Sequence, residues 1–400
     1  MVMRRKAFAY MFLGSVSLIG DAVFLYFAVF SALRVVHGGI YSGLLFAMDP
    51  LVRIAVLPWT AIWVDQLSSK IKWYWSVILS LLSFGLALLP GFFPPVGEYG
   101  YVWICFLVGL ISIASRIGEQ LRFGMSFRLA DAGIISFSKQ TSLSNLSLRG
   151  SHAIAPIIAS IILSSGWMIA ACMNAATFLC IFMASLIGYF SFEDDYEARS
   201  PLQQTEISLQ TNRLSWWTSL TLLSTNVCVG GLTLVLSSLM VFQSNLLFQY
   251  LTPVTALYAG FVLVMLLFLL YPRQQTFADK STTNIFLLFL MSACFLFSLA
   301  SIPNTIITLL FLFLGGMAYG SSLVTLLPTI LNHFRGKKMV SYTSRIQAFG
   351  RVGAVISTLG FGFLIDQHLE PYLLLRLGSI AGLVTLFFLY LLKKKMKILI

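Results

Sequence analysis

Apolar stretches long enough to cross a membrane recur along the whole chain. They lie at about 8–33, 40–64, 73–92, 100–123, 139–164, 167–190, 214–240, 253–271, 283–301, 305–331, 341–365 and 372–392. A helix rises about 1.5 Å per residue, so about 20 apolar residues cross the roughly 30 Å hydrocarbon core of a bilayer. The pattern therefore predicts an all-α membrane protein with twelve transmembrane helices.

One long polar segment divides these stretches into two sets of six. Residues 192–213 (FEDDYEARSPLQQTEISLQTNR) are acidic at the start and have no apolar periodicity. Such a segment favours a solvated linker over an acidic regulatory patch. We therefore expect a six-helix bundle over residues 1–190, a cytoplasmic linker over 191–213 and a second bundle over 214–400.

Composition and charge support this assignment. The 400 residues are 58% hydrophobic and 10% charged, whereas about 25% of the residues of a soluble protein are charged. The net charge of +12 arises mainly from bases in short loops and tails, which are cytoplasmic if the amino terminus is inside. Of the opposite loops, only one carries a base, Arg34. The charge therefore indicates orientation in a lipid bilayer of the bacterial plasma-membrane type, with both termini cytoplasmic, rather than a nucleic-acid partner.

The fifth predicted span carries polar residues on one face. Asn145, Arg149, His152 and Pro156 lie at i, i+4, i+7 and i+11, which is one side of a helix. A base in the middle of a span is costly unless it faces a water-filled cavity or a partner charge. His152 could titrate during transport, although a neutral hydrogen-bonding role in the core is the favoured interpretation.

The same pattern recurs in the second half. Residues 343–353 (TSRIQAFGRVG) align with residues 141–151, so that Asn145 matches Gln347 and Arg149 matches Arg351. One mid-membrane arginine in each half is what a two-fold repeated transporter would produce. Both guanidinium groups stay charged and present a planar fork suited to a carboxylate or a phosphate.

Two roles are open for these arginines. They could face a cavity and meet an anionic group, either the substrate or Asp21, or they could stabilise the contact between the bundles through backbone carbonyls. For Arg351 the glycine-rich surroundings favour the packing role.

Carboxylates inside the spans are the candidate proton carriers. Asp21 lies about halfway along the first span, where burial disfavours its charged form, so it could carry a proton. Equally, it could be the ion-pair partner of Arg149 or Arg53. Glu119 lies three residues from both Arg116 and Arg122, which favours a structural triad over a proton site.

Two further acidic residues lie nearer the predicted span ends. Asp49 could form an outer gate with His37, although ordinary interfacial placement is the favoured interpretation. Asp366 and Arg376 are expected to form a pair at the outer end.

A loop motif suggests a family. The end of the second span, from Pro58 to Lys70 (PWTAIWVDQLSSK), resembles the GxLADRxGRK signature of the major facilitator superfamily, with Ala61 at its first glycine and Asp65 at its aspartate. The twelve spans, the central linker and the half-chain repeat are also similar to that superfamily. The resemblance implies that Asp65 meets a helix amino terminus and a base across the interface, which locks one conformation.

Further motifs suggest a branch of this superfamily. Ser151, Ala155, Pro156 and Ala159 resemble the antiporter motif GxxxGPxxGG, although the same spacing also suits a generic packing face of small residues. Residues 335–341 (RGKKMVS) and 17–28 (SLIGDAVFLYFA), together with Arg53 five residues before Pro58, resemble the macrolide-efflux-type branch.

The resemblance implies a secondary transporter with two bundles around a central site, which exports an amphipathic small molecule in exchange for protons. It makes Asp21 the first candidate for proton coupling and Glu119 the second. The candidate cavity or substrate residues are Arg53, Asn145, Arg149, His152, Gln347 and Arg351.

Two other functions remain open. An importer or exchanger of an anionic metabolite would account for the two intramembrane arginines. A non-transporting scaffold would have no need to retain costly buried charges. The sequence contains no nucleotide-binding loop and no nucleophile–base pair, and its five cysteines lie in apolar segments without metal-ligand spacing, so we expect no cofactor, no metal and no enzymatic activity.

Overall fold

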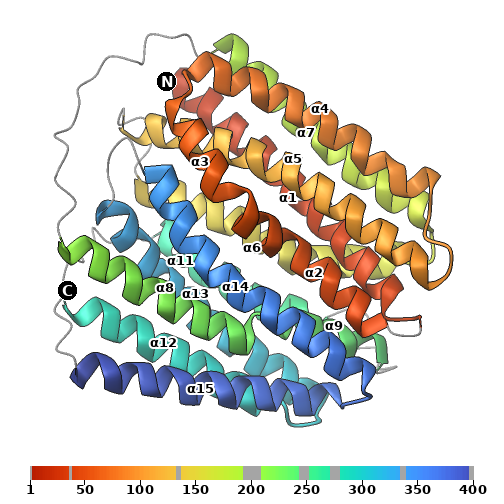
Figure 1. Cartoon of the computed structure of the whole chain (residues 1–400), viewed down its shortest axis with the longest axis vertical. Coiled ribbons are helices and arrows are strands. Elements are labelled where there is room, and N and C mark those ends of the chain that lie inside the picture. Colours follow the sequence, from red (N-terminus) through yellow and green to blue (C-terminus); the bar gives the residue numbers. More distant parts are fainter. Residues whose placement is uncertain are drawn as a thin grey trace.

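The computed structural model describes residues 2–35, 38–131, 137–191, 209–242, 252–270, 280–333 and 339–395, and in these ranges the regular structure is entirely helical (Figure 1). The first half contains α1 (Val2–Ala32), α2 (Gly38–Ala55), α3 (Leu57–Gln66), α4 (Ser69–Phe92), α5 (Gly97–Asp131), α6 (Phe137–Ile162) and α7 (Trp167–Ser191). The second half contains α8 (Leu209–Val229), α9 (Leu232–Phe242), α11 (Pro253–Leu270), α12 (Lys280–Leu299), α13 (Thr305–His333), α14 (Met339–Asp366) and α15 (Pro371–Lys395).

The helices match the predicted spans. Among the described residues, 7 helices are long and apolar enough to cross a membrane, and α2 with α3 forms one further span that is bent by 46°. Shorter apolar segments of 10–17 residues lie in α1, α6, α11 and α12. These segments correspond one to one with the twelve spans expected from the sequence, which confirms the all-α membrane fold.

Two of the spans are broken near their middles. The second breaks at Val56 between α2 and α3, and Pro58 lies in the first turn of α3, where its missing N–H group is tolerated. The seventh turns at Gly230 and Gly231, between α8 and α9. The break at Val56 gives α2 and α3 different directions, whereas α8 and α9 continue as one span over Ser219–Phe242.

The two halves form two bundles that lie side by side. Figure 1 shows α4 and α7 at one edge of the molecule and α12 and α15 at the other, with α2 and α14 adjacent in the middle. Contacts between the bundles run from α14 to α2 and α3, and from α6 to α11. The start of α1 and the end of α15 lie at the same side of the molecule, as an even number of crossings requires.

The predicted linker lies largely outside the described residues. Residues 192–208 are not described, and α8 begins at Leu209, so the last five residues of the predicted linker are helical. The domain bounds at 1–190, 191–213 and 214–400 stay predictions.

Close backbone approach joins the bundles where α2 begins and α14 ends. A Cβ atom added at Gly43 would lie 2.8 Å from the carbonyl oxygen of Thr358, and one added at Gly362 would lie 2.5 Å from that of Gly39. Glycine at these positions lets the two helices touch backbone to backbone.

The acidic end of α14 makes a contact that the sequence did not predict. Asp366 accepts hydrogen bonds from the backbone N–H groups of Gly39 and Ile40, in the first turn of α2. The expected pair with Arg376 is wrong, because Arg376 Nε donates to the hydroxyl of Ser301 instead. Asp366 thus neutralises the positive end of a helix from the other bundle.

The second half of α1 forms the centre of the core. Tyr26, Phe27 and Phe30 are among the largest fully buried side chains, and they belong to a cluster that extends into both bundles. Large apolar side chains that are exposed, such as Leu81, Phe106 and Phe388, lie on other helices and suit contact with lipid.

Candidate functional site

A cavity of about 210 Å³ lies at the centre of the molecule, between the two bundles. Residues of α1, α2, α5 and α6 from the first bundle and of α8, α9, α11 and α14 from the second line it. Since about 10–15 Å³ of probe-occupied volume suffices for one water molecule, the cavity has room for a small organic molecule. Its wall combines aromatic and aliphatic side chains with two carboxylates and four guanidinium groups.

Four charged side chains of α2 and α5 form a closed ring, and three of them, Asp49, Arg53 and Arg116, line the cavity. Arg53 contacts Asp49 at 2.9 Å and Glu119 at 3.3 Å, and Arg116 contacts Glu119 at 2.7 Å and also pairs with Asp49. Arg53 and Arg116 are only 7% and 9% exposed, so the pairing offsets a large desolvation cost. Two positive and two negative charges alternate around the ring, so its net charge is zero.

The ring corrects two sequence-based expectations. Asp49 lines the cavity instead of lying at the membrane interface, because α5 brings Arg116 against it. The second base at Glu119 is Arg53 from α2, whereas Arg122 donates to the hydroxyl of Ser76. Sequence reasoning therefore missed Asp49, although its spacing of i, i+4 from Arg53 on one helix was a usable signal.

Asp21 reaches the cavity from α1. It accepts a hydrogen bond of 3.3 Å from Ser115 Oγ of α5. Within the described part of the chain it makes no ion pair, so the expected pairing with Arg149 or Arg53 is wrong. Asp21 is thus a cavity carboxylate without a guanidinium in direct contact.

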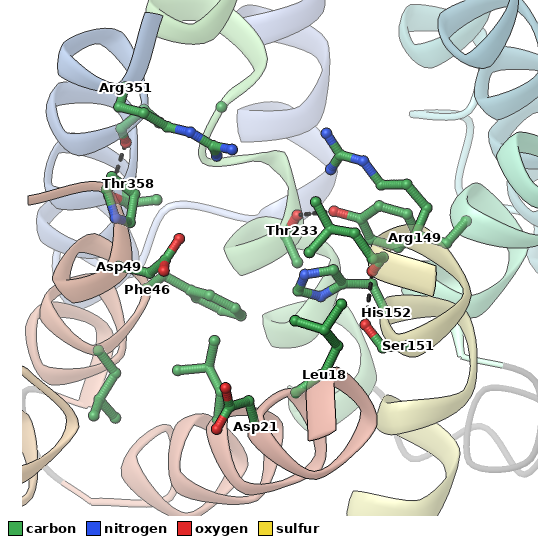
Figure 2. A pocket seen from close by; sticks show the side chains of 18 of the residues that line it. Leu18, Asp21, Phe46, Asp49, Arg149, Ser151, His152, Thr233, Arg351 and Thr358 are labelled. Atoms are coloured by element: carbon green, nitrogen blue, oxygen red, sulfur yellow. Dashed lines mark hydrogen bonds between the residues drawn. The ribbon is translucent and has the colours of Figure 1, made fainter. Parts of the chain in front are cut away.

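Arg149 extends into the cavity from α6 (Figure 2). Its guanidinium carbon lies 5.2 Å from the ring centroid of Phe261 and 5.9 Å from that of Tyr258, both on α11. Its buried Nε has no hydrogen-bond partner in the part of the chain that the structure describes. Cation–π contact partly stabilises the charge, but it leaves the N–H donors available.

Arg351 reaches the cavity from α14, in the other bundle. Figure 2 shows its guanidinium group extending toward that of Arg149 from the opposite side of the cavity. In the described residues it makes neither an ion pair nor a hydrogen bond to a backbone carbonyl, so the expected packing role is wrong for its charged end. The glycines around it do pack closely, since a Cβ at Gly350 would lie 3.1 Å from Leu222 of α8.

His152 forms an aromatic group with two tyrosines. Its Nδ1 lies 3.2 Å from the hydroxyl of Tyr26 on α1, and its ring stacks on Tyr258 of α11 with centroids 5.1 Å apart. The hydrogen bond and the stacking agree with the core role that the sequence favoured. His152 and Tyr258 line the cavity, as Arg149 does.

The remaining predicted residues fall into two sets. The side chains of Asn145, Gln347 and Asp65 lie outside the described residues, while Lys70 is exposed at the start of α4, away from the cavity. The small-residue face of α6 is buried; it consists of Ser151, Ala155, Pro156 and Ala159. The hydroxyl of Ser151 donates a hydrogen bond to the carbonyl of Leu148. No group of three histidine, cysteine or acidic side chains that could hold a metal ion occurs in the ranges that the structure describes.

The chain has the major facilitator fold, in which twelve spans form two six-helix bundles related by a pseudo-two-fold axis. The chain is similar to the crystal structure of the human organic anion transporter MFSD10 (TETRAN), with a TM-score of 0.67, 13% identity and coverage of 96% of this chain and 99% of that chain. It is also similar to the nucleoside transporter NupG, with a TM-score of 0.65, 11% identity and coverage of 97% and 99%. No protein-family model and no curated protein sequence matches the chain.

Proposed function

We propose that this protein is a secondary active transporter that moves a small amphipathic molecule through the central cavity by alternating access of the two bundles. The observation that carries the proposal is the cavity itself, which both bundles line and which contains two guanidinium groups, those of Arg149 and Arg351, without counter-ions among the described residues. A scaffold would gain nothing from such buried charge, whereas a substrate site can use it. The similarity to two transporter structures supports the same class.

We also propose protons as the coupling ion, with Asp21 as the carrier. Asp21 lines the cavity and has Ser115 as its hydrogen-bond partner, so it can gain and lose a proton without breaking an ion pair. Glu119 is less suited, because it is held by both Arg53 and Arg116. The sequence resemblance implies export in exchange for protons. The distribution of bases along the chain favours a bacterial-type plasma membrane with both termini cytoplasmic.

A second candidate concerns the charge of the substrate. Transport of an organic anion, by import or exchange, is favoured by the excess of arginines over carboxylates in the cavity wall. The neighbour MFSD10 is named as an organic anion transporter, which agrees with this candidate.

The test uses purified protein in liposomes with a pH-sensitive dye trapped inside. Cationic, neutral and anionic amphipathic compounds are added in turn under an imposed proton gradient. We expect compound-dependent proton flux that is lost in Asp21→Asn and retained in Glu370→Gln, an exposed carboxylate remote from the cavity. Flux that survives in Asp21→Asn would remove Asp21 as the carrier, and absence of flux and of compound uptake across the whole panel would contradict transport.

A further inference from the structure

Only two of the four cavity arginines have carboxylate partners among the described residues. Arg53 and Arg116 are neutralised within the ring by Asp49 and Glu119. Arg149 and Arg351 are not in contact with any described carboxylate. Both side chains are partly buried at the cavity wall. Because a guanidinium withdrawn from water without a counter-ion is unfavourable, two such groups facing the same space favour an anion as the missing partner.

The two unpaired arginines come from opposite bundles. Arg149 belongs to α6 and Arg351 to α14, and Figure 2 shows their guanidinium groups turned toward each other across the cavity. The aligned segments at 141–151 and 343–353 place them at matching positions of the internal repeat. An anion between them would therefore receive hydrogen-bond donors from both halves of the molecule at once.

Aromatic rings surround Arg149 and extend the site beyond the charge. Phe261 and Tyr258 hold the guanidinium by cation–π contact, and the ring of His152 stacks on Tyr258 at an interplanar angle of 24°. Phe46 of α2 also lines the cavity. The rings of Tyr258 and Phe261 thus lie beside Arg149, whose Nε has no hydrogen-bond partner among the described residues.

We propose that Arg149 and Arg351 form a two-sided clamp for the anionic group of the substrate, and that the Tyr258–His152 pair receives its apolar body. This inference rests on the proposed transport function and names its substrate class: a small organic anion in which a carboxylate, sulfonate or phosphate group is joined to a planar apolar part. The cavity volume of about 210 Å³ limits that body to a small ring system.

The clamp also links binding to conformation. A ligand that contacts both bundles stabilises only those arrangements in which Arg149 and Arg351 reach it together. Rocking of the bundles changes the separation of α6 and α14, so the anion is held tightly in some states and released in others. A neutral analogue of the same shape has no charge with which to hold Arg149 and Arg351 together, so it does not connect the two bundles.

The test measures binding to the purified full-length protein by calorimetry. The probes are benzoate, 2-naphthoate, 2-naphthalenesulfonate and phenyl phosphate, with 2-naphthamide as the neutral partner of 2-naphthoate and chloride and inorganic phosphate as anions without an apolar body. We expect at least one aromatic anion to bind. Its neutral partner and the inorganic anions should bind far more weakly.

Variants then assign the contacts. Arg149→Gln and Arg351→Gln should each weaken binding of that anion by about 30-fold or more, since each removes one partner of a buried charge pair. Arg149→Lys should recover part of the affinity, and Arg34→Gln, at an exposed position between α1 and α2, should leave it unchanged. Elution volume and melting temperature without ligand show whether each variant is folded. If Arg149→Gln does not fold, the affinity of Arg149→Lys is compared with that of the unchanged protein instead.

Three outcomes would overturn the clamp: no binding of any aromatic anion, equal binding of the anion and its neutral partner, or affinity that does not change in either glutamine variant. Measurements of uptake into liposomes distinguish refutation of the clamp from refutation of the proposed transport function. Uptake of cationic or neutral compounds that is unaffected in Arg149→Gln would leave transport intact and refute only the clamp. Absence of uptake for every compound would refute the transport function itself.

Discussion

The carboxylate of Asp366 accepts a 2.8 Å hydrogen bond from the backbone N–H of Gly39, across the boundary between the two bundles. Its second oxygen accepts from Ile40 at 2.9 Å. The contact exists only while the start of α2 and the end of α14 lie together. It therefore stabilises the arrangement in which the two bundles touch at this end of the molecule.

Replacing the charge should loosen that end. Asp366→Asn removes the interaction between a full negative charge and the positive end of α2, which is worth about 1 kcal/mol and shifts a two-state equilibrium about fivefold. Spin labels at Arg34→Cys and Glu370→Cys, with the exposed Cys172 replaced by serine, report the separation of the bundles at this end. We expect a larger population of long distances in Asp366→Asn than in Gln367→Asn, an exposed neighbour. Identical distance distributions in the two variants would contradict the role of Asp366.

The glycine contact at the same boundary gives a steric prediction. Gly43→Ala places a Cβ atom 2.8 Å from the carbonyl oxygen of Thr358, so the helices must separate. Overpacking of this kind costs about 1–3 kcal/mol, and the melting temperature of the purified protein should fall. Gly85→Ala in α4 is the matched control, because its new Cβ would meet nothing within 4 Å. Equal melting temperatures for the two variants would show that α2 and α14 are not held together by this contact.

The four-residue ring predicts strong coupling between Asp49 and Arg116. Either Asp49→Asn or Arg116→Gln alone leaves the ring with one uncompensated charge, at a cost of about 3–5 kcal/mol. The double variant Asp49→Asn/Arg116→Gln removes both charges, so it should be less destabilised than the sum of the single changes. Unfolding in denaturant, analysed as a double-mutant cycle, measures the interaction. Additive effects would mean that the two side chains are independent.

Tyr258 offers a way to separate ring stacking from charge in the cavity. Tyr258→Phe keeps the ring that contacts His152 and Arg149, whereas Tyr258→Leu removes it. Since an aromatic contact of this kind is worth about 0.5–1.5 kcal/mol, we expect Tyr258→Leu to weaken binding of 2-naphthoate by up to about tenfold and Tyr258→Phe to have little effect. Calorimetry on both variants checks this, and comparable losses in both would point to the hydroxyl instead of the ring.

The bilayer explains why so much of the fold was predictable. Each span must satisfy its own backbone hydrogen bonds and be apolar over a fixed length, so the twelve spans follow from the pattern of apolar stretches along the chain. Arg149 and Arg351 were identified because mid-membrane bases are rare and these two recur at equivalent positions of the repeat. His152 followed from Arg149, since both lie on one helix face.

Contacts between distant helices were less predictable. Helical spacing places Asp49 beside Arg53, but only the packing of α5 on α2 brings Arg116 to both carboxylates. Asp366 was assigned to Arg376 because the two are near in sequence, yet its actual partners are 326 and 327 residues away. Backbone N–H groups leave no sequence signal of their own, so a carboxylate that meets a helix end in another bundle cannot be identified from residue types.

The surplus of arginines in the cavity has an electrical consequence. Four guanidinium groups face the carboxylates of Asp21 and Asp49, with Glu119 behind them, so the empty centre carries at least one positive charge. A bound monoanion cancels that charge. A charge that crosses the whole membrane gains or loses about 2.3 kcal/mol per 100 mV, and a rocking movement carries the centre through part of that field. In the proposed cycle, the membrane potential therefore acts mainly on the step in which no anion is bound, so voltage would set the pace of that half of the cycle only.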